Sequence, residues 1–178
     1  MRQDLEKIII SETDLQQKIK ELGAQITSDY KDENPIFICI LRGGVMFMTD
    51  LIKEIDTPLE IDFMSVSSYG RSTTSSGVVR IRKDIDTDIQ NRHVIIVEDI
   101  VDSGLTLDYI SQYLKNHNPL SVSICTLLDK PEAHKLEIDI DYIGFKIGND
   151  FVVGYGLDYA EKYRNLPYIG ILKKEIYS

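Results

Sequence analysis

Apolar residues along the chain fall into short continuous runs that alternate with longer segments in which they recur at helical spacing. The runs at 36–40, 94–97 and 120–128 have the length and the β-branched content of buried strands. Over 15–26 and 107–114, apolar positions instead recur every three or four residues, as on one face of a helix. This alternation predicts an α/β fold with a mostly parallel sheet flanked by helices.

Local signals indicate the remaining elements. Ser11-x-x-Asp14 resembles a capping box, with Asp in place of Glu or Gln, and begins a first helix that should end near Asp32. The other expected elements are a helix at 45–55 and strands at 59–67, 78–82, 142–147 and up to Leu172. No repeat and no linker divides the sequence, so we expect one domain.

Composition narrows the class of protein. With 178 residues, of which 43% are hydrophobic and 28% charged, the chain can bury one substantial core, and any second lobe should be small. The net charge of -9 argues against a nucleic-acid partner, because phosphate backbones are bound through clustered Lys and Arg. It does not argue against a phosphorylated substrate, since a bound magnesium ion reverses the local sign of charge.

The first ten residues show neither a signal peptide nor a membrane-spanning segment. Four charged residues there precede an apolar run of only three residues. Cys39 and Cys125 both lie inside apolar runs, where reduced and buried thiols are expected. We therefore expect a cytoplasmic protein with no membrane partner.

Candidate chemistry is concentrated between Val94 and Leu107. The strand there leads to Glu98 and Asp99, and the turn 102–106, Asp-Ser-Gly-Leu-Thr, precedes a helix. Backbone N–H groups at the start of a helix attract an anion, so this turn predicts a phosphate cup. The Walker and Gly-x-Gly-x-x-Gly patterns are absent. A sugar with two hydroxyls and a 5'-phosphate fits this order of groups; the alternative is an ordinary turn with an acidic rim.

Two further loops could take part in a site. Residues 41–44, Leu-Arg-Gly-Gly, join a strand to a helix, and the glycine pair with a permanent cation makes a second anion site plausible. Glycines in such turns are more often structural. The segment 68–77 is the least hydrophobic of the chain, and it is either a surface excursion or a mobile lid that excludes water.

Three alternating aspartates, Asp84, Asp86 and Asp88, raise the possibility of a calcium loop. Ile89 and Ile95 stand where such a loop requires Gly and Glu. The segment is therefore expected to be a solvated turn.

Residues 94–107 resemble the phosphoribosyl pyrophosphate signature of type I phosphoribosyltransferases. The form Glu-Asp-x-x-Asp-Ser-Gly at 98–104 resembles the hypoxanthine-guanine branch in particular. A second block, 151–159 followed by Arg164, is also similar to these purine-salvage enzymes. The resemblance covers roughly residues 36–171, in four blocks whose order matches the family.

The resemblance implies a fold and an activity. The fold is the type I phosphoribosyltransferase fold, a twisted, mostly parallel sheet flanked by helices, with a small hood and a mobile active-site loop. Residues 1–178 would form a single domain, with a core at about 36–147 and a hood from the N-terminal segment and about 148–178. The activity is magnesium-dependent transfer of 5-phosphoribosyl from phosphoribosyl pyrophosphate to hypoxanthine or guanine, which releases pyrophosphate.

The resemblance also implies a role for each site residue, with Asp102 as the general acid/base at the purine N7. The ribose and its 5'-phosphate would be held by Glu98, Asp99, Ser103, Gly104, Leu105 and Thr106. Pyrophosphate would be held by Leu41, Arg42, Gly43, Gly44 and Arg164, with a cis Leu41–Arg42 peptide and a lid at Ser68 and Tyr69. The purine would be bound by Lys130, Phe151, Val152 and Asp158. The magnesium ligands would be Glu98, Asp99 and, through water, Asp158.

Two other functions stay open at this point. Some relatives of the fold are RNA-binding or DNA-binding regulators that retain the cup, although the acidic charge and the set of Asp102, Lys130, Phe151 and Asp158 favour an enzyme. An enzyme acting on xanthine or another base is the nearer rival. By analogy with relatives, we expect a homodimer or a homotetramer.

Overall fold

The computed structural model describes residues 1–68 and 79–177. Most of the expected lid, including Tyr69, lies outside the described residues. Ser68 is the last residue of a strand, and nothing is described of its side chain.

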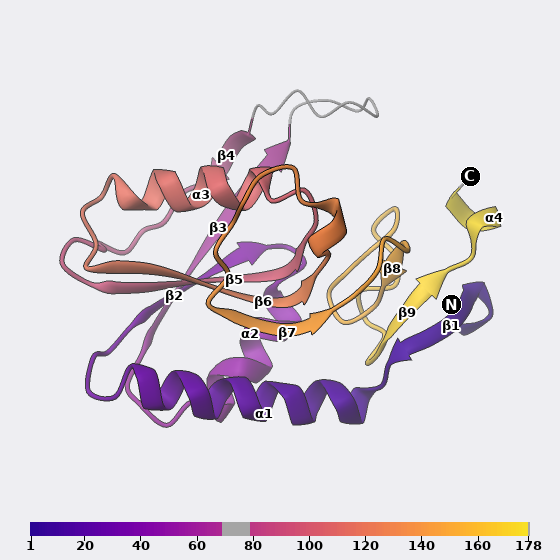
Figure 1. The fold of residues 1–178 in the computed structure, drawn as a ribbon, viewed down its shortest axis with the longest axis horizontal. Coiled ribbons are helices and arrows are strands. Elements are labelled where there is room, and N and C mark those ends of the chain that lie inside the picture. Colours follow the sequence, from indigo (N-terminus) through magenta and orange to yellow (C-terminus); the bar gives the residue numbers. More distant parts are fainter. Residues whose placement is uncertain (69–78, 178) are drawn as a thin grey trace.

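The centre of the molecule is a six-stranded sheet in the order β4-β3-β2-β5-β6-β7 (Figure 1). All neighbouring strands are parallel except β3 and β4, which pair antiparallel. The strands are β2 (Ile36–Leu41), β3 (Glu60–Ser68), β4 (Val79–Lys83), β5 (His93–Val101), β6 (Ser121–Asp129) and β7 (Tyr142–Lys146). The prediction of an α/β fold with a mostly parallel sheet is confirmed.

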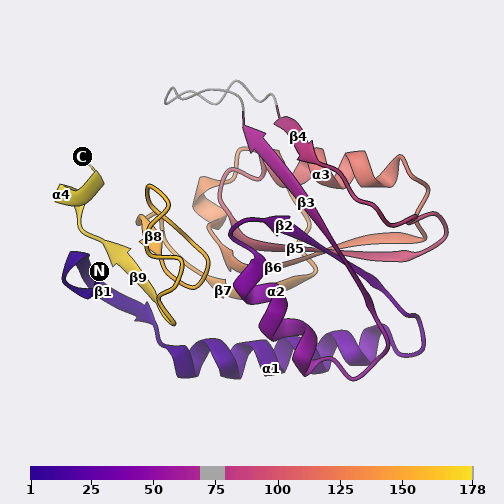
Figure 2. The same ribbon diagram turned by 180° about the vertical axis from the view of Figure 1, so that it is seen from behind.

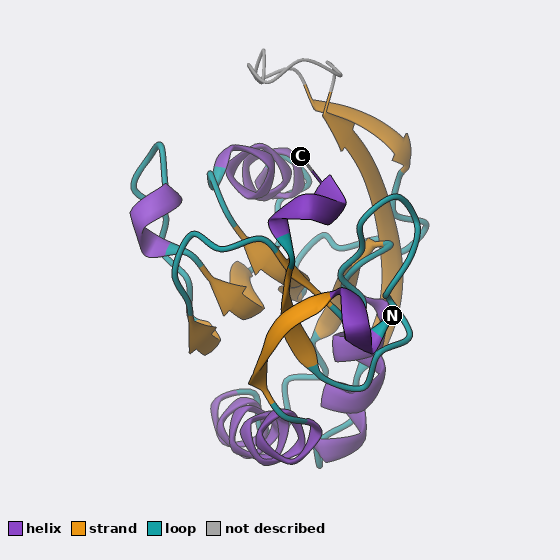
Figure 3. Cartoon of the chain, turned by 90° about the vertical axis from the view of Figure 1, so that its right-hand side faces the viewer, coloured by secondary structure: helices purple, strands orange, loops and turns teal. Residues whose placement is uncertain are grey.

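Strand β5 shows why both faces of this sheet are covered. Val94 and Ile96 pack on the side of α3 (Leu105–Lys115), whereas Ile95 and Val97 pack on the side of α1 (Glu12–Asp29) and α2 (Val45–Leu51). Figure 3 shows the sheet between helices on its two sides. Burying one such side chain stabilises the fold by about 1.5–3 kcal/mol. A run that is apolar at every position can be buried on both faces of a sheet, which is why it forms a central strand.

The helices begin where the sequence indicates and end earlier. Ser11 Oγ accepts a hydrogen bond from the Asp14 N–H at 3.2 Å, and Asp14 Oδ2 accepts one from the Ser11 N–H at 3.3 Å, which confirms the capping box. Helix α1 ends at Asp29, and α2 ends at Leu51 and continues as the 3-10 turn η2 (Ile52–Glu54). Helix α3 ends at Lys115, before Pro119, and Asn118 adopts a left-handed φ of 54°.

A second, three-stranded sheet joins the two ends of the chain beside the central sheet (Figures 1 and 2). Its order is β1-β9-β8, and both pairs are antiparallel. Its strands are β1 (Leu5–Ile10), β8 (Val152–Val153) and β9 (Ile169–Leu172). The short helical segments are η1 (Arg2–Asp4), η3 (Pro131–Ala133) and α4 (Lys174–Tyr177). The hydrophobic pattern did not predict β1, because charged residues occupy most of its exposed positions.

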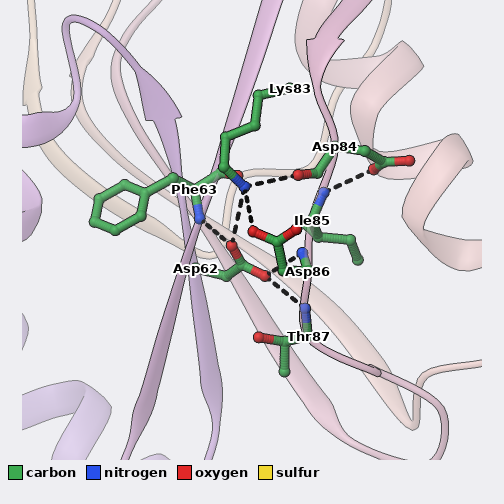
Figure 4. A network of polar contacts seen from close by, with 7 residues as sticks. All are labelled: Asp62, Phe63, Lys83, Asp84, Ile85, Asp86 and Thr87. Carbon is green, nitrogen blue, oxygen red and sulfur yellow. Dashed lines mark hydrogen bonds and ion pairs between the residues drawn. The ribbon is translucent and has the colours of Figure 1, made fainter.

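A buried carboxylate fixes the connection that leaves β4 (Figure 4). Asp62, which is 6% exposed, accepts hydrogen bonds from the backbone N–H groups of Phe63 (2.6 Å), Asp86 (2.8 Å) and Thr87 (2.8 Å). Lys83 Nζ lies 3.6 Å from the same carboxylate. Burial alone would raise the pKa of Asp62, but the backbone donors outweigh it and the pKa is lowered.

The aspartates that follow β4 are exposed, so the prediction of a solvated turn is confirmed. Asp86 Oδ2 accepts a hydrogen bond from Lys83 Nζ at 2.9 Å, and Asp84 accepts one from the Tyr113 hydroxyl. Within 1–68 and 79–177, no group of three His, Cys, Asp or Glu side chains could hold a metal ion. Among the helices of the same ranges, none is long and apolar enough to cross a membrane.

Candidate active site

The candidate site lies where the strand order reverses. From β2 the chain proceeds to β3 on one side, whereas β5 proceeds to β6 and β7 on the other. Open α/β sheets bind ligands at such a point, outside the carboxyl ends of the strands. The loop 41–44 follows β2, and the turn 102–104 follows β5, so both predicted anion loops lie there.

Glu98 and Asp99 lie side by side within β5, which extends four residues beyond its predicted end. The Asp99 N–H donates a hydrogen bond to Glu98 Oε1 at 3.2 Å. Burial first, and then the charge of Asp99, raise the pKa of Glu98 well above its ordinary value. Burial also raises the pKa of Asp99, although Arg164 partly opposes this shift. Two adjacent carboxylates in this state favour a cation.

Gly43 brings three segments of the site together. A Cβ atom at Gly43 would collide with Asp99 Oδ2, and one at Gly156 would collide with the Gly43 carbonyl oxygen. Only glycine therefore allows the loop after β2 to lie between β5 and the segment around 156. The Leu41–Arg42 peptide is cis, as the resemblance implies.

The predicted phosphate cup surrounds a cavity of about 110 Å³ at the start of α3. Its lining residues are Glu98, Ile100, Val101, Asp102, Ser103, Gly104, Thr106 and Leu107. Gly104 is the N-cap residue in a left-handed conformation (φ 79°) and has no side chain to cap the helix. The N–H groups of the first turn are thereby left for an anion. Asp102 is exposed at the rim of the cup.

Lys130 follows β6 and lies beside the cup. It is 8% exposed, and its N–H donates to the Val101 carbonyl at 2.9 Å. The Lys135 N–H likewise donates to the Ser103 carbonyl at 3.0 Å. Before Lys130, Asp129 Oδ1 lies 2.7 Å from His134 Nε2. These contacts attach the whole 129–135 connection to the wall of the cup.

The segment after β8 is organised by Arg164. Its Nη1 donates to the Gly156 carbonyl at 2.7 Å, and its Nη2 lies 2.8 Å from Asp158 Oδ1. The other oxygen of Asp158 accepts the Glu161 N–H at 2.9 Å. Of the predicted purine contacts before it, Val152 is buried, whereas the Phe151 side chain is 37% exposed.

Glu161 is a site residue that the sequence reasoning missed. Its Oε2 lies 3.0 Å from Arg42 Nη1 and 3.3 Å from Arg164 Nη2, so one carboxylate oxygen contacts both predicted pyrophosphate arginines. The spacing of Glu161 and Arg164 is visible in the sequence. Arg42 lies 119 residues from Glu161 along the chain, so no local signal in the sequence indicates their contact.

The structure thus brings most predicted residues to one edge of the sheet, with two qualifications. Asp158 does not join Glu98 and Asp99 in a single ligand group within the described chain. Both of its oxygens already have partners, so it could reach a metal ion only by sharing them or through water. The lid prediction falls on residues that are not described.

Comparison with known proteins identifies the family. The model of the phosphoribosyl transferase domain matches residues 11–160. The chain belongs to this family.

Relatives of similar length match the chain from end to end. It is 56% identical over 177 residues to the hypoxanthine-guanine phosphoribosyltransferase of Bacillus subtilis (strain 168), covering 99% of this chain and 98% of the relative. With the protein of the same name from Streptococcus mutans it shares 53% identity, over 100% and 99% of the two chains. A crystal structure of a hypoxanthine phosphoribosyltransferase from Staphylococcus aureus superposes with a TM-score of 0.97 at 52% identity, covering 100% of this chain and 97% of that one. The type I phosphoribosyltransferase fold is therefore confirmed.

Proposed function

We propose that this chain is a hypoxanthine-guanine phosphoribosyltransferase of purine salvage. It transfers 5-phosphoribosyl from phosphoribosyl pyrophosphate to the purine and releases pyrophosphate. The identity of more than half of the chain to full-length relatives of that name supports this function. The observation that carries it is the uncapped start of α3, whose cavity Glu98 also lines, together with two arginines that meet at Glu161, a set of groups suited to a sugar with a phosphate at each end.

Phosphoribosyl pyrophosphate lies across the edge of the sheet in this proposal. Its 5'-phosphate accepts hydrogen bonds from the N–H groups of Ser103, Gly104, Leu105 and Thr106. Its pyrophosphate group contacts residues 41–44 and Arg164. Glu98 and Asp99 face the ribose hydroxyls between these two ends. The anionic groups thus meet donors, and the hydroxyls meet acceptors.

Magnesium fits the carboxylates of β5. Desolvation raises the pKa values of both, and the charge of Asp99 raises that of Glu98 further. A divalent cation with oxygen ligands would relieve such an environment. When bound, the ion neutralises charge on the pyrophosphate. Asp158 would hold a second ion through water, since both of its oxygens already have protein partners.

The purine stacks on Phe151, and Lys130 donates a hydrogen bond to its 6-oxo group. The exposed ring of Phe151 and the position of Lys130 beside the cup support this arrangement. The backbone of Val152 contacts the edge of the base.

In the reaction, the bond from the anomeric carbon to a pyrophosphate oxygen breaks and the bond to purine N9 forms. Negative charge increases on the departing pyrophosphate, where Arg42, Arg164 and backbone N–H groups stabilise it. Positive charge develops on the ribose, and the lid at Ser68 and Tyr69 protects it from water. Asp102, exposed at the rim of the cup, accepts the N7 proton of the base.

Three wider proposals accompany this mechanism. The chain acts as one domain, with a core at about 36–147 and a hood built from both ends. It works as a homodimer or homotetramer. The compartment is the cytoplasm, a proposal supported by Cys39 and Cys125, which are free and buried, and by burial raising the pKa of Cys39 to about 12.

A steady-state assay over adenine, hypoxanthine, guanine, xanthine, uracil and orotate, with phosphoribosyl pyrophosphate and magnesium, tests the function. Turnover should be highest with hypoxanthine or guanine. A preference for xanthine would identify the nearer rival. Absence of turnover, together with salt-sensitive RNA binding, would instead identify a regulator.

Lys130→Ala tests the assignment of the base contact. It should raise the KM for the purine far more than the KM for phosphoribosyl pyrophosphate, because it removes the donor to the 6-oxo group. Lys135→Ala, which changes an exposed lysine of the same connection, is the matched control and should leave both constants unchanged. An equal rise of both constants in Lys130→Ala would place Lys130 elsewhere.

A further inference from the structure

Three aromatic side chains gather at the exposed end of the small sheet. The rings of Phe151 and Tyr177 are stacked, with centroids 4.9 Å apart and planes inclined by 25°. Tyr159 meets Phe151 edge-on at 5.8 Å and Tyr177 at 6.3 Å. Tyr177 belongs to α4, which follows β9 at the end of the chain (Figure 1). No role for Tyr177 follows from the motifs of the sequence.

The backbone holds Tyr177 in this position. The Leu172 N–H donates to the Phe151 carbonyl at 2.9 Å, and the Lys173 N–H donates to the Asp4 carbonyl at 3.0 Å. Ile176 and Tyr177 also pack against the apolar cluster of the small sheet, which contains Leu5, Val153 and Leu172. The stack is therefore anchored on both sides, by the strand pairing that carries Phe151 and by the last helix.

Phe151 stays partly exposed although Tyr177 stacks on its ring. With Tyr177 against one face, the Phe151 side chain is still 37% exposed, so part of the ring remains open. An exposed aromatic ring that must receive a base loses rotamer freedom on binding, which weakens affinity. A second ring stacked behind it reduces this loss in advance.

We propose that Tyr177 is a positioning residue for the purine site, which holds the Phe151 ring ready for a 6-oxopurine to stack on the part of the ring that stays exposed. This inference rests on the proposed function, because it takes Phe151 as the platform for the base. It adds a contribution from α4 to a site otherwise formed at the carboxyl ends of the central strands and by the segment around β8. Tyr177 itself does not touch the reacting atoms.

Kinetics of three variants test the inference. Tyr177→Leu keeps an apolar side chain against the cluster but removes the ring, and should raise the KM for hypoxanthine about 3- to 10-fold, the size of an aromatic pair. The KM for phosphoribosyl pyrophosphate and the melting temperature should stay near wild type. Tyr177→Phe should restore the wild-type value, because the stack needs the ring and not the hydroxyl. Glu175→Ala, an exposed position of the same helix, is the control.

Each other outcome has a definite meaning. If Tyr177→Leu leaves the KM for hypoxanthine unchanged, or raises both KM values equally, Tyr177 has only a structural role and the inference is wrong. If it lowers the KM, Tyr177 occupies the place of the base, which also overturns the inference. Failure of the proposed function would be distinct, because the wild-type enzyme itself would then show no turnover with hypoxanthine or guanine.

Discussion

Asp62 and the pair Glu98–Asp99 are acids of one sheet with opposite environments. Asp62 is buried, whereas Glu98 and Asp99 are partly exposed. Asp62 receives three backbone N–H groups and a nearby lysine, and its pKa is lowered (Figure 4). Desolvation raises the pKa values of both Glu98 and Asp99, and the charge of Asp99 raises the pKa of Glu98 further. The first acid stabilises the fold as a carboxylate. The charged form of the pair Glu98–Asp99 is disfavoured unless a cation is bound.

The hydrogen-bond donors around each acid distinguish the structural Asp62 from the candidate ligands Glu98 and Asp99. A carboxylate whose hydrogen bonds are all supplied by the protein has nothing left to offer a ligand. An adjacent pair of acids with raised pKa values is instead a candidate binding site. Substitutions at each position should therefore have opposite effects on stability and activity.

The largest effect is expected at Asp102, an acid that is exposed at the rim of the cup. Asp102→Asn keeps the size of the side chain but cannot accept the N7 proton. Turnover should fall roughly 100- to 10,000-fold, or about 3–5 kcal/mol of transition-state stabilisation. Calorimetry with magnesium should show an almost unchanged affinity for phosphoribosyl pyrophosphate. Loss of that affinity with normal turnover at saturation would make Asp102 part of the cup instead.

Glu98→Gln and Asp99→Asn should weaken the binding of phosphoribosyl pyrophosphate with magnesium about 10- to 100-fold. Without ligand, both variants should melt at or above the wild-type temperature, because each replaces a carboxyl group whose charged form is disfavoured by desolvation. Titration calorimetry and thermal melts measure the two effects. A clear drop in melting temperature would show that the pair stabilises the fold, as Asp62 does.

Asp62→Asn should lower the free energy of unfolding by about 2 kcal/mol and leave the KM values at 25 °C unchanged. Because the folded-state pKa of Asp62 is lowered, its contribution is present above the ordinary Asp pKa of about 4 and is lost as the pH falls below it. Denaturant unfolding of both proteins between pH 7 and pH 3 should show the difference shrinking. A difference that is constant with pH would contradict the role of the charge.

The smallest effect is expected at Glu161, whose ion pairs with Arg42 and Arg164 are largely exposed. Glu161→Gln removes a negative charge that competes with pyrophosphate for both arginines. The dissociation constant of magnesium pyrophosphate should fall about 2- to 5-fold. Glu6→Gln, which makes the same change of charge at an exposed position of β1, is the control. Weaker binding in Glu161→Gln would mean that the carboxylate holds the arginines in place.

Sequence reasoning was most successful where local signals dominate. The apolar run of β5, the capping box at Ser11 and the glycines of 41–44 each reflect a constraint within a few residues, and each lies where it was expected. The family and its activity followed from motif order. The roles of individual site residues stay predictions.

The rest depends on contacts between distant segments. Strand β1 carries charged residues and is a strand because β9 pairs with it. Glu161 meets Arg42 across 119 residues, and Tyr177 meets Phe151 through the fold of the last helix. Asp62 looks like any polar residue of a strand until three backbone donors converge on it. Such features have no periodicity or spacing that a single sequence displays.

The pairing of β1 with β9 has a consequence for synthesis on the ribosome. Leu5 pairs with Leu172 and Ile10 with Ile169, so the first strand to emerge waits for the last one. At about 5–20 residues per second, this delay is on the order of ten seconds or more. All six strands of the central sheet are made in that interval. The last strand of the central sheet ends at Lys146, so it is made only about 1–6 seconds before Arg164 and Tyr177. The small sheet, which needs β9, should therefore close after the strands of the central sheet have been made.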